Sequence, residues 1–265
     1  MPFARKRFGQ HFLEPAWVEK LVRAIAPDPS DTFLEIGPGH GALTRPLLAH
    51  AQHVVAFEID RDLTAALRAA ARPALTIVEG DFLDVDANEI RTAVAGAGSL
   101  RVAGNLPYNV ASPILFKLID LYAAGIPLVD ATVMLQREVA DRLVARPGTR
   151  EYGVLSVLVG HSSEAERILT LPPGAFRPAP KVHSAVVRLR FHAPNPPSRN
   201  HQIFASLVQA IFTRRRKTVG NALKAFRLSE SLAPADALRH AGLDGQRRPE
   251  TLSIAELVHL SDAFG

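Results

Sequence analysis

Four consecutive residues, Asn105-Leu106-Pro107-Tyr108, bring an amide, a proline and an aromatic hydroxyl together directly after a short apolar run, Leu100 to Gly104. The run has the length and composition of a buried strand, and open α/β sheets bind their ligands at the carboxyl ends of the strands. We therefore expect this tetrapeptide to face a ligand.

The tetrapeptide suits an aromatic amine such as N6 of adenine. That nitrogen is a weak nucleophile because its lone pair is delocalised into the ring, and two hydrogen-bond acceptors aimed at its protons would localise the pair. The Asn105 side-chain oxygen is one acceptor, and the Leu106 carbonyl, held in a fixed direction by Pro107, is the other. Tyr108 offers a flat face for stacking the base, and Gly104 lets the base approach the backbone. On these residues alone, an Asn-Pro-type turn with a buried tyrosine is an equally good explanation.

A glycine-rich segment, Gly37-Pro38-Gly39-His40-Gly41, follows the expected strand Phe33 to Ile36 and precedes a helical pattern. Its GxGxG spacing differs from the GxGxxG of dinucleotide-binding loops, which hold a pyrophosphate at a helix N-terminus. A ligand without phosphates fits better, and S-adenosylmethionine (SAM) is such a ligand, because its ribose and methionine backbone need close approach to Gly37 and Gly39. A tight strand-to-helix connection is the alternative for these glycines alone.

Acidic side chains stand at the ends of the next two expected strands. Glu58 ends the strand that begins at Val54, about 20 residues after the loop, where a carboxylate can accept hydrogen bonds from both ribose hydroxyls. Asp81 follows the strand Leu75 to Val78 and can accept from an adenine amino group, while Phe82 packs nearby. Each carboxylate alone is explained as a surface charge or a helix cap, but the three features together indicate an adenosyl ligand.

Composition bounds the protein class. The chain has 265 residues, of which 47% are hydrophobic, enough for one large domain and a small one. It contains no cysteine, which excludes disulfides, thiolate zinc sites and cysteine nucleophiles. No apolar run reaches the roughly 18 residues needed to span a bilayer, and the basic N-terminus has no apolar segment after it, so we expect a cytoplasmic protein without membrane contact. The histidines are scattered and no metal site is expected.

The alternation of apolar runs and helical patterns between Phe33 and about Leu135 predicts a parallel sheet covered by helices. Two more strands, 165–171 and 184–191, flank a proline-rich segment and are expected to close the sheet as an antiparallel pair. A helix is expected at 15–25, after an irregular basic arm. The fold class that follows is α/β, a Rossmann-like, mostly parallel sheet of seven strands.

The domain organisation follows from a proline-rich linker, His192 to Ser198. We expect an α/β domain at residues 1–192 and a helical domain at 198–265. Residues 137–145 read as a helix, whereas 153–159 are apolar without a period that decides between helix and strand. The second domain begins with apolar residues at helical spacing, namely Ile203, Phe204, Leu207, Val208, Ile211 and Phe212.

Positive charge concentrates in the second domain. The formal net charge is +5, and residues 198–265 carry 10 Lys and Arg against 6 Asp and Glu. Arg214-Arg215-Arg216-Lys217 ends the first helix of that domain and exceeds what a helix dipole requires, so we expect phosphate contacts. Arg5-Lys6-Arg7 stands among aromatic residues, which favours binding of a nucleic-acid strand, whereas Phe8, Phe12 and Leu13 are expected to fold over the ligand. A solvated surface is the alternative for both basic groups.

Read together, these segments resemble the small-subunit ribosomal RNA adenine-N6 dimethyltransferase family. The resemblance spans nearly the whole chain. The segments that carry it are Arg7-Phe8-Gly9-Gln10-His11-Phe12-Leu13, Glu35-Ile36-Gly37-Pro38-Gly39, Glu58-Ile59-Asp60, Asn105-Leu106-Pro107-Tyr108, Phe176-Arg177-Pro178-Ala179-Pro180-Lys181-Val182 and Arg215-Arg216-Lys217-Thr218.

The resemblance implies a seven-stranded methyltransferase domain with SAM as cofactor and a helical domain that helps to place the RNA. It implies cofactor contacts from His11, Leu13, Gly37, Glu58, Asp81 and Asn105, and Phe176 is expected to stack on the base beside Tyr108. Two positions depart from the commonest pattern: His11, where asparagine is frequent, and His183, where aspartate is frequent. His11 can still hydrogen-bond the carboxylate of the cofactor.

The expected activity is dimethylation of two adjacent adenosines near the 3′ end of small-subunit rRNA, by a monomer acting on the ribosomal subunit or its precursor. Two alternatives stand beside it. One is a large-subunit rRNA adenine methylase of the antibiotic-resistance type, which shares the fold but is disfavoured by segments 176–182 and 215–218. The other is a non-catalytic RNA-binding assembly or transcription factor.

Overall fold

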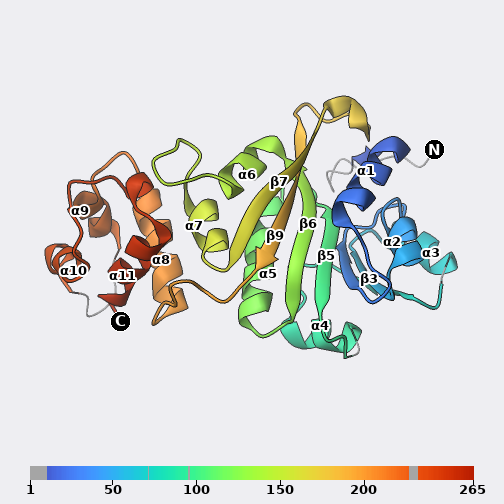
Figure 1. Ribbon diagram of the computed structural model, residues 1–265, viewed down its shortest axis with the longest axis horizontal. Coiled ribbons are helices and arrows are strands. Elements are labelled where there is room, and N and C mark those ends of the chain that lie inside the picture. Colours follow the sequence, from blue (N-terminus) through green and yellow to red (C-terminus); the bar gives the residue numbers. More distant parts are fainter. Residues whose placement is uncertain (1–10, 71, 95, 227–231) are drawn as a thin grey trace. The chain divides into compact units, whose positions relative to one another are not determined.

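The computed structural model describes residues 11–70, 72–94, 96–226 and 232–265 (Figure 1). It divides into two compact units. The first contains the described residues up to Ala140 together with Ala165–Phe191, and the second contains Asp141–Glu164 and His192–Gly265. The segment 141–164, expected in the first domain, therefore belongs to the helical unit. Its helix α7 (Val154–Gly160) packs on the later helices, and Tyr152 packs edge-on against Phe212.

A seven-stranded sheet forms the centre of the first unit, and the expected fold class is confirmed. Its order is β4-β3-β2-β5-β6-β9-β7. The strands are β2 (Thr32–Ile36), β3 (His53–Glu58), β4 (Leu75–Glu79), β5 (Leu100–Asn105), β6 (Leu128–Gln136), β7 (Ser163–Leu171) and β9 (Ser184–Phe191). Strands β2 to β6 pair in parallel, and β9 runs antiparallel to β6.

The strand order creates a crevice at the site of interest. The chain adds β3 and β4 on one side of β2, then returns to place β5 and β6 on the other side. The connections after β2 and β5 therefore lead in opposite directions, and such a reversal opens a ligand-binding crevice at the carboxyl ends of the two strands. The glycine loop directly follows β2, and Asn105 is the last residue of β5, so both lie at this crevice.

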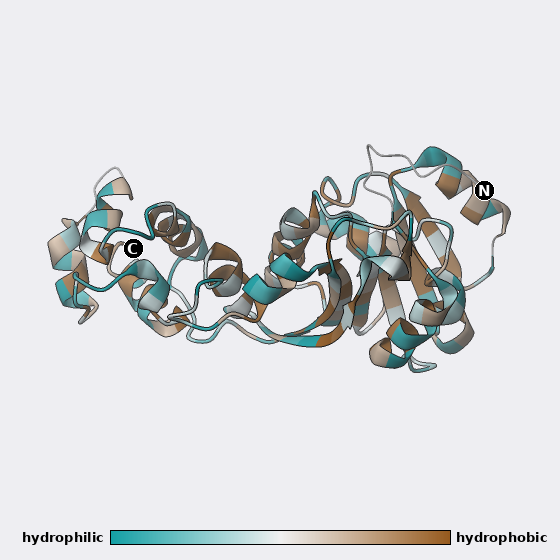
Figure 2. Ribbon diagram, turned by 90° about the horizontal axis from the view of Figure 1, so that it is seen from above, coloured by the Kyte–Doolittle hydropathy of each residue, from teal (hydrophilic) through white to brown (hydrophobic). Residues whose placement is uncertain are grey.

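The central strands read as apolar runs because both faces of the sheet are covered. Every residue of β2 is buried, including Glu35. In Figure 2 the strands are coloured mostly as hydrophobic, whereas the helices carry both colours. The helices of this unit are α1 (Pro15–Ile25), α2 (Thr44–His50), α3 (Arg61–Ala69), α4 (Ala87–Ala93), α5 (Ala111–Ala123) and α6 (Arg137–Leu143), the last of which crosses the boundary between the units.

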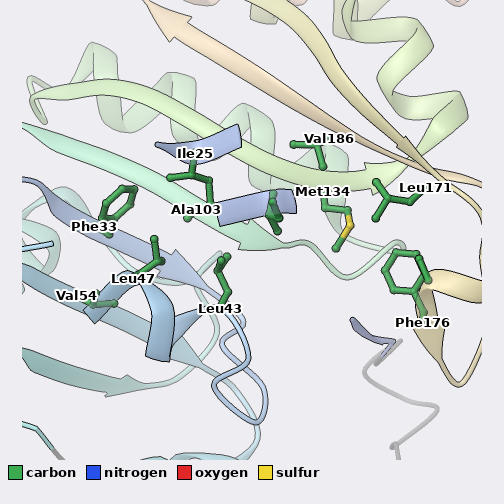
Figure 3. Packing of buried hydrophobic residues seen from close by; sticks show 12 residues of the cluster. Ile25, Phe33, Leu43, Leu47, Val54, Ala103, Met134, Leu171, Phe176 and Val186 are labelled. Atoms are coloured by element: carbon green, nitrogen blue, oxygen red, sulfur yellow. The ribbon is translucent and has the colours of Figure 1, made fainter. Parts of the chain in front are cut away.

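One core cluster joins α1 and α2 to the sheet (Figure 3). Ile25 of α1 and Leu47 of α2 pack with Phe33 and Ala103 on the strands, all of them inaccessible to solvent. The C-terminal end of α1 is held by Arg101. Its guanidinium pairs with two aspartate carboxylates and donates to the Ile25 carbonyl at 2.8 Å. This fixes α1, and with it the polypeptide just before it, against the sheet.

A two-stranded ribbon lies outside the main sheet. Strand β1 (Phe12–Leu13) pairs antiparallel with β8 (Phe176–Arg177). An irregular arm is expected here from the sequence, but the last two residues of that arm are extended and paired. Glu14 strengthens the ribbon through an ion pair with Arg177 at 2.8 Å.

The second unit is helical. Besides α7 it contains α8 (His201–Phe212), α9 (Val219–Ala222), α10 (Pro234–His240) and α11 (Ile254–Asp262). Five of the six apolar positions expected on α8 are buried, and Ile203 is half-buried. Asn200 caps α8 by accepting from two backbone N–H groups, and Ser253 does the same for α11 within a capping box. In the described part of the chain, no helix is long and apolar enough to cross a bilayer.

Candidate active site

A cavity of about 360 Å³ lies at the carboxyl ends of β2 and β5, a size typical of small-molecule sites. It is lined by the β1 strand, by α1, by the glycine loop and by the ends of β3, β4 and β5. Every residue that the sequence analysis assigns to cofactor or catalysis lines it: His11, Leu13, Gly37, Gly39, Glu58, Asp81, Phe82, Asn105, Leu106, Pro107 and Tyr108. The topology thus brings together residues separated by up to ninety-seven positions of sequence, from His11 to Tyr108.

The glycine loop is open because its backbone adopts a conformation that side chains oppose. Gly37, Gly39 and Gly41 have φ angles of +68°, +60° and +74°. A Cβ on Gly39 would lie 3.3 Å from the Phe12 ring of the β1 strand. At Gly37 and Gly39 the loop therefore presents backbone to the cavity.

Glu58 is tied to this loop. One carboxylate oxygen accepts from the Gly39 N–H at 3.0 Å and the other from the Asp60 N–H at 2.9 Å. Burial raises the pKa of Glu58, and these backbone hydrogen bonds oppose the shift. Each oxygen keeps a further lone pair, so the carboxylate can still accept from a diol. Asp60 caps α3 by accepting from the Asp62 N–H.

Asp81 and Phe82 lie on the adjacent side of the cavity. Asp81 accepts from the Leu83 N–H at 2.9 Å through one oxygen, which fixes the carboxylate at the end of β4. The Phe82 ring is buried edge-on against Phe57. One acidic group thus stands at the end of β3 and another after β4, the arrangement expected for an adenosyl ligand.

The Asn105 amide is oriented by the polypeptide just before α1. Its Nδ2 donates to the His11 carbonyl oxygen at 2.7 Å. A carbonyl can only accept, so the amide nitrogen must face His11 and Oδ1 is the atom left to accept from a ligand. The neighbouring backbone is fixed as well, because the Leu106 N–H donates to the Met134 carbonyl at 3.0 Å.

Tyr108 stands beside the amide in a defined rotamer. Its hydroxyl and the Ser184 hydroxyl lie 2.5 Å apart, and its ring stacks on His11 with centroids 5.3 Å apart. Burial raises the pKa of Tyr108, whereas the contact with Ser184 lowers it. The His11 Nδ1 donates to the Pro178 carbonyl at 2.7 Å, so the ring expected on the cofactor carboxylate is held by the loop after β8.

Two residues have structural roles that the sequence did not predict. A Cβ on Gly104 would lie 2.7 Å from the Ile36 carbonyl of β2, so the neighbouring strand by itself requires this glycine. The Phe176 side chain is fully buried in the core cluster (Figure 3) and does not line the cavity, so as placed it cannot stack on a base. Its ring fills the space beneath the β1–β8 ribbon, close to Leu171 and Leu13.

No role for Glu35 is predicted from the sequence, although it is a buried carboxyl in the wall of the cavity. It is 1% exposed and its Oε2 has no hydrogen-bond partner. Burial raises the pKa of Glu35 to about 8, opposed by the Thr44 hydroxyl and reinforced by the charge of Glu58. The signal in the sequence is a carboxylate inside an otherwise apolar strand, since such residues are rarely buried without a partner.

The two basic segments are only partly described. Arg5, Lys6, Arg7 and Phe8 lie outside the described residues. Arg214, Arg216 and Lys217 are exposed in the turns after α8, whereas Arg215 donates to the Arg150 carbonyl at 2.8 Å. This hydrogen bond joins the loop 146–150 to the four cations within the second unit. As for metals, no cluster of three or more potential ligands occurs among the residues with described positions.

Comparison with known proteins identifies the family. The family model described as ribosomal RNA adenine dimethylase matches residues 2–263. Proteins named ribosomal RNA small subunit methyltransferase A from Acinetobacter baylyi and Nitrosococcus oceani are 43% and 45% identical, covering 98% and 97% of this chain and 92% and 95% of their own lengths.

Two solved structures share the fold. A dimethyladenosine transferase from Plasmodium falciparum has a TM-score of 0.75 at 24% identity, covering 94% of this chain and 96% of that one. The 23S rRNA methyltransferase ErmE has a TM-score of 0.65 at 26% identity, covering 96% and 99%. The expected enzyme class, a methyltransferase with SAM as methyl donor, is confirmed, and the chain belongs to the ribosomal RNA adenine dimethylase family.

Proposed function

We propose that this enzyme dimethylates N6 of two adjacent adenosines near the 3′ end of small-subunit rRNA. The orientation of the Asn105 amide carries the proposal, because it leaves Oδ1 as an acceptor at the point where the cavity meets the end of β5. The relatives that are 43% and 45% identical bear the name of a small-subunit rRNA methyltransferase, whereas the large-subunit enzyme ErmE is 26% identical.

The cavity residues fit SAM. Glu58 and Asp81 offer acceptors for ribose and adenine, the glycine loop offers exposed backbone, and the buried Oε2 of Glu35 lacks a partner. When bound, SAM supplies an electrophilic methyl group on a sulfonium. Catalytic contacts are assigned to Asn105, Leu106, Pro107 and Tyr108.

The residues of the chain act mainly by positioning. Asn105 Oδ1 and the Leu106 carbonyl accept hydrogen bonds from the two N6–H groups, which localises the lone pair on nitrogen for in-line attack. Tyr108 holds the extruded base by stacking, with its own hydroxyl fixed by Ser184. Once it carries the methyl group, the attacking nitrogen is cationic and acidic enough to release its proton to water, so no dedicated base is needed. A second transfer requires the monomethylated amine to turn and give up one of the two hydrogen bonds.

The basic surface of the second unit, with Arg214, Arg215, Arg216 and Lys217, contacts RNA phosphates, and the N-terminal Arg5, Lys6 and Arg7 are assigned to the same role. The substrate is the small subunit or its precursor in the cytoplasm, and the enzyme acts as a monomer.

Incubation of unmodified small and large ribosomal subunits with methyl-labelled SAM, followed by mapping of the labelled nucleotide, tests the proposal. We expect label on two adjacent adenosines of the small-subunit RNA. Label on large-subunit RNA alone would favour the resistance-type activity. Tight binding of SAM without any transfer would favour the non-catalytic assembly factor.

A further inference from the structure

The His11 and Tyr108 rings lie against each other in the wall of the cavity. Their centroids are 5.3 Å apart and their planes differ by 25°, which is the geometry of a direct, offset stack. Over the ranges that the structure describes, no second aromatic ring contacts Tyr108. The chain itself therefore covers one face of Tyr108 and leaves the other face without an aromatic partner.

Both rings are held in place from outside the stack. The Tyr108 hydroxyl lies 2.5 Å from the hydroxyl of Ser184, a fully buried residue at the start of β9. The His11 ring donates from Nδ1 to the Pro178 carbonyl at 2.7 Å, and the His11 backbone carbonyl accepts from Asn105 at 2.7 Å. A base placed between the two rings needs about twice the spacing of a direct stack, so these anchors would have to break. The uncovered face of Tyr108 needs no such movement.

The hydrogen bond to Pro178 also limits what the His11 ring can do for the cofactor. A carbonyl only accepts, so Nδ1 carries the hydrogen, and Nε2 of the neutral ring is an acceptor. The neutral ring thus has no donor left for the carboxylate of SAM. Stacking on Tyr108 is the interaction that remains for it. Asparagine at the same position would offer the reverse, an amide donor and no ring.

We infer that His11 is a positioning residue for the target base: its ring covers one face of Tyr108 and holds the phenol ring still, so that the adenine stacks on the opposite face. The inference rests on the proposed function, because it takes an adenine as the group that stacks on Tyr108. The backbone carbonyl of the same residue orients the Asn105 amide. His11 thereby sets both the plane of the base and the acceptor for its amino group.

Two substitutions of His11 separate this role from a contact with the cofactor. His11→Phe keeps a ring on Tyr108 but loses both ring nitrogens, whereas His11→Asn keeps a polar side chain but loses the stack. Both lose the imidazole bond to Pro178 and keep the backbone carbonyl. At saturating SAM, we expect His11→Asn to raise the KM for unmodified small ribosomal subunits by roughly 2- to 10-fold, because a free Tyr108 ring must be ordered when the base binds. We expect the KM of His11→Phe to stay close to the native value.

Calorimetric titration of SAM into the full-length enzymes gives the opposing readout. A ring that served the cofactor would make His11→Phe the weaker SAM binder and leave His11→Asn close to native in both measurements, and that pattern would overturn the inference. A native KM in a His11→Asn enzyme with an unchanged melting temperature would overturn it as well.

If His11→Asn does not fold, NMR of the native enzyme with labelled histidine and tyrosine replaces it. We expect the Overhauser contacts between the His11 and Tyr108 rings to persist when S-adenosylhomocysteine and an RNA fragment carrying the target adenosines are bound. Loss of these contacts would show that the base enters between the rings, which contradicts the inference. Failure of the native enzyme to label small subunits at all would instead contradict the proposed function.

Discussion

The Asn105 side chain donates to the His11 carbonyl oxygen at 2.7 Å across ninety-four positions of sequence. A backbone acceptor from the N-terminal segment thus decides which end of the catalytic amide faces the cavity. His11 is in turn held by the loop after β8, through its ring and the Pro178 carbonyl. The pairing of β1 with β8 therefore helps to orient the Asn105 amide toward the cavity.

Replacement of Asn105 should abolish methyl transfer with little effect on folding. Asn105→Ala removes the acceptor, and Asn105→Asp keeps the shape but cannot donate to the His11 carbonyl. We expect kcat to fall by at least about 10²-fold in both, the loss seen when one oriented polar group is removed from a transition state. Transfer of labelled methyl groups to unmodified small subunits measures the effect.

The matched control is Asn88→Ala, on the exposed face of α4, which removes the same amide far from the cavity. It should retain normal activity. Near-normal turnover of Asn105→Ala with an unchanged melting temperature would rule out the assigned role.

Substitutions of Phe176 test whether its ring only stabilises the core or also contacts the target base. Its ring is fully buried, so Phe176→Ala should lower the free energy of unfolding by about 3–5 kcal/mol. Phe176→Leu keeps most of the apolar volume and should cost less than about 1.5 kcal/mol. Urea denaturation measures both, and methyl transfer by Phe176→Leu should stay near normal. A stable Phe176→Leu enzyme that has lost transfer would show that the ring leaves the core to meet the base.

The sequence predicts what depends on local pattern and fails where packing decides. The strands β2 to β5 and helix α1 are predicted within one or two residues, because buried parallel strands read as apolar runs between turns. Helix α7 could not be assigned, because it is buried almost throughout and its one polar residue, Ser156, is buried too, so the run shows no period.

The candidate site shows the same division. Residues at strand ends reach the cavity because the topology sends every parallel strand to one edge. The role of Gly104 could not be predicted, because it depends on the distance to Ile36 in a neighbouring strand. The hydrogen bond from Asn105 to His11 joins two segments that no periodicity relates. Phe176 stands in a proline-rich segment, and its burial depends on packing with distant residues of the core cluster.

Neutralising the exposed cations after α8 should weaken RNA binding in a salt-dependent way. Arg214→Gln, Arg216→Gln and Lys217→Gln combined should reduce the slope of log K against log salt by up to about 2–3, because each lost phosphate contact removes about 0.7–0.9. Arg215 is left intact because it donates to the Arg150 carbonyl. Filter binding of small-subunit RNA over a range of salt concentrations gives the slope. The control is Lys224→Gln, which removes an exposed cation of the same unit. An equal change of slope in this variant would mean that net charge, and not a defined basic surface, determines RNA binding.

Glu35 should make the free enzyme less stable as pH rises. Its pKa is about 8 in the folded chain against 4.5 for the ordinary group, so between these values the folded state holds one proton more than the unfolded state. The free energy of unfolding then falls with pH across this window, by up to about 1.4 kcal/mol per pH unit from this one group. The stabilisation is fully present below pH 4.5 and lost as the pH passes the folded pKa.

Glu35→Gln removes the proton and should flatten this part of the profile. Urea denaturation of both proteins at intervals from about pH 5 to about pH 9 measures the difference, which should grow in favour of the variant as the pH rises. Glu19→Gln makes the same exchange on the exposed face of α1 and should leave the slope unchanged. Parallel profiles for the native enzyme and Glu35→Gln would mean that the carboxyl is ionised in the folded chain, since only an extra bound proton in the folded state can produce a falling profile that glutamine removes.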